Sequence, residues 1–224
     1  TVSMKSAIHP RSGRTRQLII ESAAPIFKKK GYAGTSMSDL TTATGLTKGS
    51  IYGNFKDKDD VAVHAFQHNI DLIFDFFSKE LKAAGPTLDK LLAYPRGFRK
   101  VYRMILSYGG CPILNTAVEA DDTHAVLRKM AMDVLAKWKK SIVTLSEKGK
   151  SEGVIDAATQ AQNMAEILIA IMEGGSVLSK VTGEESYMLN AIDTAEKMID
   201  DMRTIKKTQP YTARYNSKHI RKRP

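Results

Sequence analysis

The sequence predicts an all-α fold of about nine helices, in which a small N-terminal three-helix domain is followed by a larger helical domain. Apolar residues recur at the 3.6-residue spacing of amphipathic helices along almost every segment, and the alternation typical of strands is rare. Glycine and proline separate these segments. Because 42% of the 224 residues are apolar, the chain can bury a sizeable core.

The first helix is expected at residues 15–30, where Gly31 supplies a left-handed C-terminal stop. Pro25 lies inside this helix and should bend its axis, because proline lacks a backbone N–H. The apolar face of the helix is expected to comprise Leu18, Ile19, Ala23, Ile26 and Phe27.

Two short helices are expected next. Ser36 and Asp39 form a capping box that starts one helix, and Gly45 ends it. Thr47 then caps a second helix at residues 48–54, and two short helices joined by a glycine-containing turn form a helix-turn-helix. The core of this small domain is expected to contain Leu40, Ala43, Leu46, Ile51 and Phe55.

A long helix at residues 58–83 should link the two halves of the chain. Asp57 and Asp60 repeat the capping arrangement at its start, and the functional boundary is placed near Asp60. Its core face is expected to include Val61, Ala65, Phe66, Leu72, Ile73 and Phe76.

Five further helices are expected in the C-terminal part. Pro95 should break the first of them, Pro112 should start the second, and Gly149 and Gly153 should end the third. They are expected at residues 88–107, from Pro112 onward, 122–148, 158–181 and 184–206.

The formal net charge of +10 is concentrated at the two ends of the chain. Residues 1–60 carry ten Lys or Arg against five Asp or Glu (+5), residues 205–224 carry seven against none (+7), and residues 61–204 carry 17 against 19 (−2). Basic ends favour a polyanionic partner, although a solvated, disordered tail explains the second cluster equally well.

The single cysteine, Cys111, cannot form an internal disulfide, and a reducing cytosolic compartment is therefore expected. No run of about 18 apolar residues predicts a membrane span, and the first 16 residues lack the apolar centre of a signal peptide. We accordingly expect a cytoplasmic protein with no membrane partner.

The ordered run from Gly31 to Lys58, with Thr47-Lys48-Gly49-Ser50-Ile51-Tyr52-Gly53-Asn54-Phe55 at its centre, closely resembles the DNA-binding domain of the tetracycline-repressor (TetR/AcrR) family. With the first helix, the resemblance covers about 65 of 224 residues. It implies a sequence-specific transcriptional regulator, most simply a repressor released from a palindromic operator by a small-molecule effector. The implied layout is a flexible basic arm at 1–13, a helix-turn-helix domain at 14–60, a ligand-binding and dimerisation domain at 61–207, and a disordered basic tail at 208–224.

In the family, the second helix of the motif enters the major groove of double-stranded DNA. Matching positions make Lys48, Gly49 and Ser50 candidates for base-edge contact, and the small residues let the backbone approach a groove wall. The full set of candidate DNA contacts is Ser36, Ser38, Thr47, Lys48, Gly49, Ser50, Tyr52, Asn54 and Lys58.

The alternative is that Tyr52 packs, Thr47 only caps, and the lysines are solvated surface charges. The basic residues Arg11, Arg14 and Arg16 either add DNA contacts or form a disordered arm without function.

A palindromic operator requires two copies of the motif, and the resemblance implies a homodimer formed by the last two helices as a four-helix bundle. The run at residues 165–178 is apolar almost all round, which fits burial against a second copy. The alternative is a central core helix. Gly174 and Gly175 would permit a close helix crossing or a bend.

The resemblance also implies an effector pocket for an apolar or aromatic molecule, although a plain core explains each residue equally well. Cys111 precedes a predicted helix, a setting that lowers a thiol pKa and suits a sensor of oxidants or electrophiles, but a buried inert thiol is the favoured interpretation. The candidate pocket residues are Phe98, Tyr102, Met104, Tyr108, Cys111, Met130, Trp138 and Met164.

Two other functions are alternatives to transcriptional regulation. A helical-bundle enzyme finds no support, because the sequence holds no Glu-x-x-His pair, cysteine cluster or phosphate-binding glycine loop. His64 and His68 lie one turn apart but have no third ligand nearby, so neither a metal nor a cofactor is expected. A DNA-binding architectural or cell-division protein of the same fold, without an effector, stays open.

Overall fold

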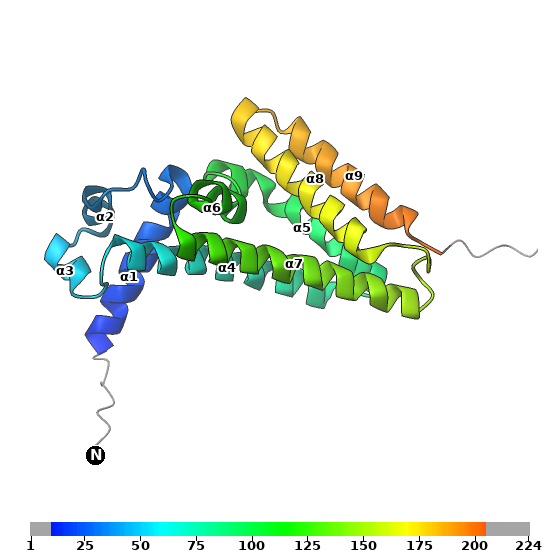
Figure 1. Cartoon of the computed structure of the whole chain (residues 1–224), viewed down its shortest axis with the longest axis horizontal. Helices are drawn as coiled ribbons and strands as arrows, with labels where there is room; N and C mark the ends of the chain where they lie inside the picture. Colours follow the sequence, from blue (N-terminus) through cyan, green and yellow to red (C-terminus); the bar gives the residue numbers. More distant parts are fainter. Residues whose placement is uncertain (1–9, 205–224) are drawn as a thin grey trace, which may run out of the picture.

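The computed structural model describes residues 10–204, and these form nine α-helices with a single isolated bridge between Ile155 and Arg203 (Figure 1). The predicted all-α fold is confirmed. The helices are α1 (Pro10–Lys30), α2 (Met37–Thr44), α3 (Lys48–Tyr52), α4 (Lys58–Ala83), α5 (Thr87–Ser107), α6 (Pro112–Ala120), α7 (Ala125–Ser151), α8 (Ala161–Thr182) and α9 (Ser186–Asp201).

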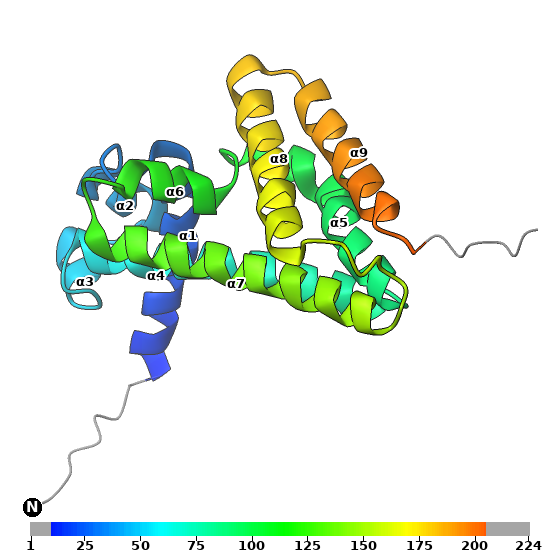
Figure 2. The same ribbon diagram turned by 45° about the vertical axis from the view of Figure 1, so that its right-hand side comes forward.

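The small domain at one end consists of α1, α2, α3 and the start of α4 (Figures 1 and 2). Its core gathers fully buried apolar side chains from each of these helices, and α1 packs along α4. The residues at the centre of this cluster are Ile19, Ala23, Leu40, Ile51, Phe55, Val61 and Ala65.

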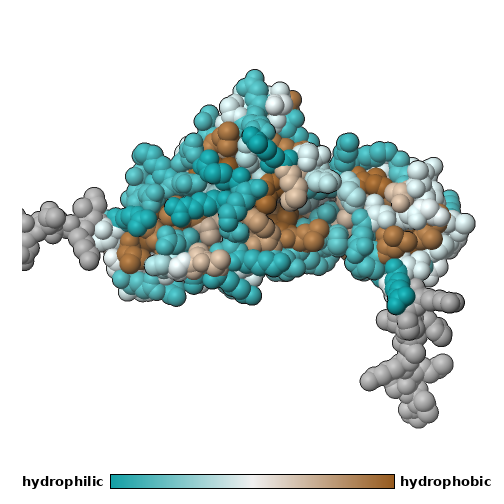
Figure 3. Space-filling model, turned by 180° about the vertical axis from the view of Figure 1, so that it is seen from behind, coloured by the Kyte–Doolittle hydropathy of each residue, from teal (hydrophilic) through white to brown (hydrophobic). Residues whose placement is uncertain are grey.

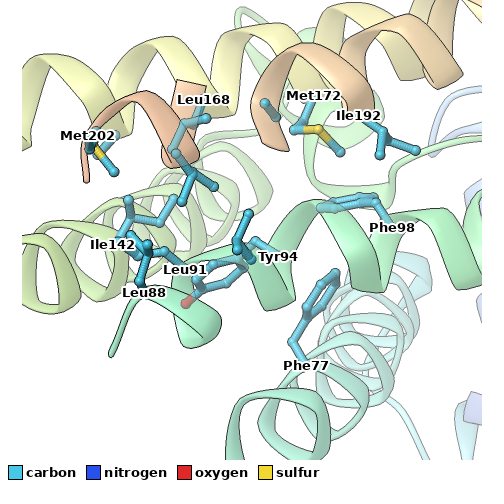
Figure 4. Packing of buried hydrophobic residues seen from close by; sticks show 14 of the residues in the cluster. Phe77, Leu88, Leu91, Tyr94, Phe98, Ile142, Leu168, Met172, Ile192 and Met202 are labelled. Carbon is cyan, nitrogen blue, oxygen red and sulfur yellow. The ribbon is translucent and has the colours of Figure 1, made fainter. Parts of the chain in front are cut away.

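The larger domain is built around α4, α5 and α7, with α8 and α9 packed on them as an antiparallel pair (Figure 2). Aromatic side chains hold the centre of its core. Phe77 of α4 faces Phe98 of α5, with 5.1 Å between their ring centroids, and Tyr94 lies beside them (Figure 4). This long core joins the small domain through α4, which belongs to both.

Two predicted helix breaks are wrong and a third is confirmed. Pro95 lies inside a continuous α5, because neighbouring helices bury this segment and compensate for the missing hydrogen bond. Gly149 lies inside α7 rather than ending it, and its bare Cα makes room for Ile155, whose Cδ1 would lie 2.5 Å from an added Cβ. Gly153, with φ +68°, follows the helix end as predicted.

Several other expectations need correction. The first helix begins at Pro10 rather than residue 15, and α3 ends at Tyr52 rather than residue 54. Leu18, Ala43 and Leu72 are exposed instead of buried, while Ile70 and Phe77 take the core positions on α4. Helical periodicity locates the apolar face of a helix but not its exact margins. The neighbouring helices decide which residues at those margins are buried.

Two expectations fall on residues that the structure does not describe. Residues 1–9 of the arm expected at 1–13 and the basic tail at 208–224 lie outside the described residues, as does the expected end of the last helix at residue 206. Residues 10–13, expected in the flexible arm, belong to α1. Along residues 10–204, no helix combines the length and the apolar character needed to cross a membrane.

Candidate nucleic-acid interface and ligand cavity

Helix α2 starts with the predicted capping box. The Ser36 hydroxyl accepts a hydrogen bond from the Asp39 backbone N–H, and the Asp39 carboxylate accepts one from the Ser36 N–H at 2.9 Å. Lys30 at the end of α1 binds the same carboxylate at 2.6 Å. The Lys30 ammonium and the Ser36 N–H hold the pKa of Asp39 at about 2, so the carboxylate stays ionised and ties α1 to α2.

Helix α3 follows α2 after the left-handed residue Gly45 (φ +67°). Thr47 caps it, since its hydroxyl accepts a hydrogen bond from the Ser50 N–H at 3.2 Å. Ile51 faces inward and is fully buried, which leaves Lys48, Gly49 and the rest of this short helix turned outward. A Cβ added to Gly49 would meet only the Thr47 hydroxyl at 4.0 Å, so no protein atom requires glycine there.

The structure brings most predicted DNA contacts onto one outward surface, which we call the α2–α3 surface. Tyr52, which is 44% exposed, lies at the edge of this surface, with Lys48 Nζ 5.8 Å from its ring centroid. The other members are exposed and come from the starts of α2 and α3. The α2–α3 surface comprises Ser36, Ser38, Thr47, Lys48, Gly49 and Tyr52.

The other three predicted contacts, Ser50, Asn54 and Lys58, are half-buried, and the side chains of Asn54 and Lys58 have partners inside the domain. Asn54 donates its side-chain amide to the Ser50 carbonyl at 2.9 Å. The Lys58 ammonium donates to the carbonyls of Tyr32 and Thr35 at 3.0 and 3.1 Å, and it lies 4.1 Å from the Tyr32 ring centroid. Lys58 therefore holds the connection between α1 and α2.

Arg16, an alternative DNA contact in the sequence, also has internal partners. Its guanidinium donates to the Asn54 carbonyl, lies 2.7 Å from a ring nitrogen of His64, and stacks 4.0 Å from the centroid of Phe55. His64 itself contacts Asp60. Through Arg16 and Asp60, His64 takes part in a structural contact. Within residues 10–204, no three potential metal ligands gather into one group.

Known proteins match both the helix-turn-helix domain and the C-terminal domain. The family profile described as "Bacterial regulatory proteins, tetR family" matches residues 19–65, and "Tetracyclin repressor-like, C-terminal domain" matches residues 87–195. A solved TetR-family regulator from Cytophaga hutchinsonii shares 39% identity, with 88% of this chain and 99% of that chain covered and a TM-score of 0.79.

The chain belongs to the TetR family. It is a DNA-binding transcriptional regulator with an N-terminal helix-turn-helix and a C-terminal domain. A TetR regulator from Chloroflexus aurantiacus is 33% identical, with a TM-score of 0.83 over 88% of this chain and 100% of that chain. The HTH-type transcriptional repressor DhaR from Mycobacterium sp. is 26% identical over 170 residues, or 74% of this chain and 82% of that protein.

The C-terminal domain of this TetR-family protein contains a cavity of about 560 Å³ between α4, α5 and α7, closed at one end by α6 and α8. Its volume lies within the range of sites for small organic molecules. Three predicted pocket residues, Phe98, Cys111 and Trp138, line it.

The other five predicted pocket residues lie elsewhere. Tyr102 is buried beside the cavity, and its hydroxyl donates to Glu185. Met130 and Met164 pack at the edges of two core clusters, while Met104 and Tyr108 are more than half exposed. The prediction missed Ile70, Phe77 and Tyr94, because a helix-by-helix pattern does not show which apolar faces leave space between them.

Glu173 on α8 is a buried acidic residue of the cavity that the sequence prediction missed. It lines the cavity at 6% exposure, and its Oε1 accepts a hydrogen bond from the Cys111 thiol at 3.0 Å. Burial and the neighbouring Glu173 carboxylate raise the pKa of Cys111 well above its ordinary value, which fits the buried, unreactive thiol. In the sequence, Glu173 is the only acid in the apolar run at 167–178, and this pattern could have indicated a buried polar site.

Helix α6 connects this cavity with the helix-turn-helix domain. Cys111, Pro112 and Ile113 at its start line the cavity, whereas Glu119 near its end accepts hydrogen bonds from the backbone N–H groups of Tyr32 and Ala33 at 2.9 and 2.8 Å. Gly31 (φ +75°) is needed at this contact, since an added Cβ would lie 2.4 Å from the Glu119 carboxylate.

A second contact lies beside the first. His124 caps α7 by accepting a hydrogen bond from the Leu127 N–H at 3.2 Å, and its ring meets the edge of Tyr32 with 4.8 Å between centroids. The Tyr32 hydroxyl donates to Asp59 at the start of α4, which raises the pKa of Tyr32 to about 12. The two domains are therefore joined by polar contacts as well as by α4.

Proposed function

We propose that this TetR-family protein is a cytoplasmic repressor that binds a palindromic operator as a homodimer and leaves it when a small molecule enters the cavity. The α2–α3 surface supports the DNA-binding half of the proposal. In the proposed complex, α3 enters the major groove and Lys48 and Gly49 approach base edges. Phosphates are contacted by Thr47, Tyr52 and the two serines at the start of α2, Ser36 and Ser38.

An apolar stripe on α8 supports dimerisation. Ile167, Ile171, Gly174, Leu178 and Val181 follow a 4-3-4-3 spacing, and none of them is buried in the single chain. Val181 is 77% exposed and Leu178 is 47% exposed. Side chains at this spacing on two helices interdigitate, so the stripe fits the same stripe of a second copy. Gly175, one position away, is instead occupied by the close crossing of α9 within the chain.

The observation that supports release by an effector is that helix α6 contacts both the cavity and the helix-turn-helix domain. One end of α6 lines the cavity, and its other end binds the segment that precedes α2. A ligand that shifts α6 would change the distance between the two recognition helices of a dimer. A hundredfold loss of operator affinity requires a coupling free energy of about 2.7 kcal/mol.

The proposal is tested by selecting genomic fragments on the purified protein and measuring affinity for the recovered sites. We expect recovered sites with two half-sites about one helical turn or more apart, bound by a dimer, and an affinity that falls steeply with salt. A monomer with no salt-sensitive preference among duplexes would contradict it. Expression profiling after deletion adds a second readout, in which a repressor changes a few transcripts rather than many.

A further inference from the structure

The cavity is long and has chemically different ends. Along α4 its lining runs from Ile70 to Lys82, which corresponds to about 18 Å at the helical rise per residue. Glu173 and Cys111 lie at the inner end, next to α6 and α8, whereas Lys82 and Lys90 line the opposite end. Lys82 is exposed there, so this end reaches solvent.

The middle of the cavity is aromatic. Phe77 and Phe98 lie 5.1 Å apart between centroids (Figure 4), and Phe98 lies 5.7 Å from Trp138. Apolar areas also interrupt the hydrophilic surface on the face shown in Figure 3. Lys137 is the charged residue in this middle part, and it is exposed. An elongated apolar body therefore fits the length of the cavity.

Two buried polar atoms at the cavity lack a hydrogen-bond partner within the described structure, Glu173 Oε2 and Trp138 Nε1. Burial raises the pKa of the Glu173 carboxyl to about 6, so the group is ionised near pH 7.5 and above. A buried carboxylate whose second oxygen is unpaired costs free energy, and a cation or hydrogen-bond donor placed beside it recovers part of that cost.

We propose that the cavity binds an elongated, largely apolar molecule with an ammonium group at one end, which pairs with the carboxylate of Glu173. This inference deepens the proposed function and rests on it, since the molecule would be the effector. The lysines at the outer end favour an uncharged tail over a second cation. A metal ion does not fit, because no group of three potential ligands occurs within residues 10–204.

The test uses three probes that share one alkyl chain: dodecylamine, dodecanol and dodecanoate, each below the concentration at which it forms micelles. Trp138 is the only tryptophan in the chain, so the intrinsic fluorescence of the full-length dimer reports occupancy of the cavity. We expect dodecylamine to bind more tightly than dodecanol, and dodecanoate to bind most weakly. This ranking needs no variant.

Glu173→Gln supplies the second arm, because it keeps the shape of the side chain and removes its charge. We expect it to weaken dodecylamine binding about tenfold or more and to leave dodecanol binding unchanged. Glu166→Gln is the matched control on the same helix, since Glu166 is exposed and pairs with Lys139 at 3.2 Å. It should change neither affinity.

Three outcomes would overturn the inference: dodecanoate binding as tightly as dodecylamine, no probe binding at all, or an unchanged dodecylamine affinity in Glu173→Gln. Operator binding measured in the same preparations separates this inference from the proposed function. Loss of probe binding with intact operator binding rejects the ligand class alone. Dodecylamine binding that does not release the operator supports the ligand class and rejects the effector role.

Discussion

Lys58 has hydrogen-bond partners inside the domain and is also a proposed DNA contact. Its ammonium donates to two backbone carbonyls between α1 and α2, although the family resemblance assigns it to phosphate. A lysine ammonium has three N–H donors, so two carbonyl partners leave one donor for a further acceptor. We therefore expect Lys58→Ala to lower stability as well as DNA affinity, in contrast to a residue whose only role is contact with DNA.

Lys48 and Tyr52 should differ in what they contribute to DNA recognition. Lys48→Ala is expected to reduce discrimination between cognate and altered base pairs by about 1–3 kcal/mol, because an exposed lysine on α3 can reach guanine acceptors. Tyr52→Ala should weaken binding to all duplexes alike. Titrations of cognate and scrambled DNA test both variants, and equal losses on the two duplexes for Lys48→Ala would refute its assignment.

A substitution at Gly49 should affect DNA affinity without lowering the stability of the fold. Gly49→Ala meets open space in the free protein and improves helix propensity, so stability should be unchanged or rise by up to about 1 kcal/mol. Operator affinity should nevertheless fall, since the new methyl group keeps α3 away from the groove wall. Thermal unfolding and DNA titration together test this. Gly85→Ala, between α4 and α5, is the control, and undiminished operator affinity in Gly49→Ala would contradict the docking of α3.

Glu173 should make the stability of the free protein depend on pH. Its pKa rises from 4.5 in the unfolded chain to about 6 in the fold, and that difference corresponds to about 2 kcal/mol. The contribution is fully present below pH 4.5 and is lost as the pH rises through 6. Glu173→Gln should therefore gain about 2 kcal/mol relative to the wild type between pH 4 and 7.5. Urea unfolding at fixed protein concentration measures this, and a constant difference would disprove it.

Among the helices, α6 contacts the cavity at one end and the helix-turn-helix domain at the other. Its start lines the cavity, and its end holds the segment before α2 through Glu119. The sequence predicted this helix from Pro112 but gave no sign of the connection, since residue 119 and residue 32 are far apart in the chain. Contacts of that kind follow from the packing of α1 against α6.

Glu119→Ala should loosen the helix-turn-helix domain. Two backbone N–H groups lose a charged acceptor, so hydrogen exchange at Tyr32 and Ala33 should accelerate and operator affinity should fall about tenfold. Exchange monitored by mass spectrometry and DNA titration provide the two measurements. Asp121→Asn is the control, because Asp121 follows the end of α6 and pairs with Arg128 of α7 at 3.0 Å. Unchanged exchange at Tyr32 and Ala33 would show that α6 does not hold them.

Element boundaries show where sequence patterns succeed and where they fail. Caps are local, so Ser36, Thr47 and Asp57 identified the starts of α2, α3 and α4 to the residue. Pro95 and Gly149 misled the prediction because their effects are decided by surrounding helices, which bury Pro95 and place Ile155 against Gly149. The exposed residues at the starts of α2 and α3 were predictable because they lie beside these caps, whereas most of the cavity lining was not.

For the whole molecule, the proposed dimer places the exposed stripe on α8 against the same stripe of a second copy. Leu178→Asp places a charge in the middle of that stripe, and we expect a monomer with greatly reduced operator affinity, because a charge buried in an apolar interface without a partner is costly. Sedimentation and DNA titration test this. Gln162→Asp adds the same charge at an exposed position of α8 away from the stripe and is the control, and a stable Leu178→Asp dimer would place the interface elsewhere.

The amino-acid sequence by itself determined the helical fold, the capped helix-turn-helix and the residues that α3 presents, because spacing, caps and turns are properties of a few consecutive residues. Only the tertiary structure decided that Lys58 and Arg16 bind within the domain, that Glu173 meets Cys111 in a cavity, and that Glu119 links α6 to the small domain. Each of these contacts joins residues distant in the chain, so its existence depends on how the helices pack and on which side chains that packing removes from water.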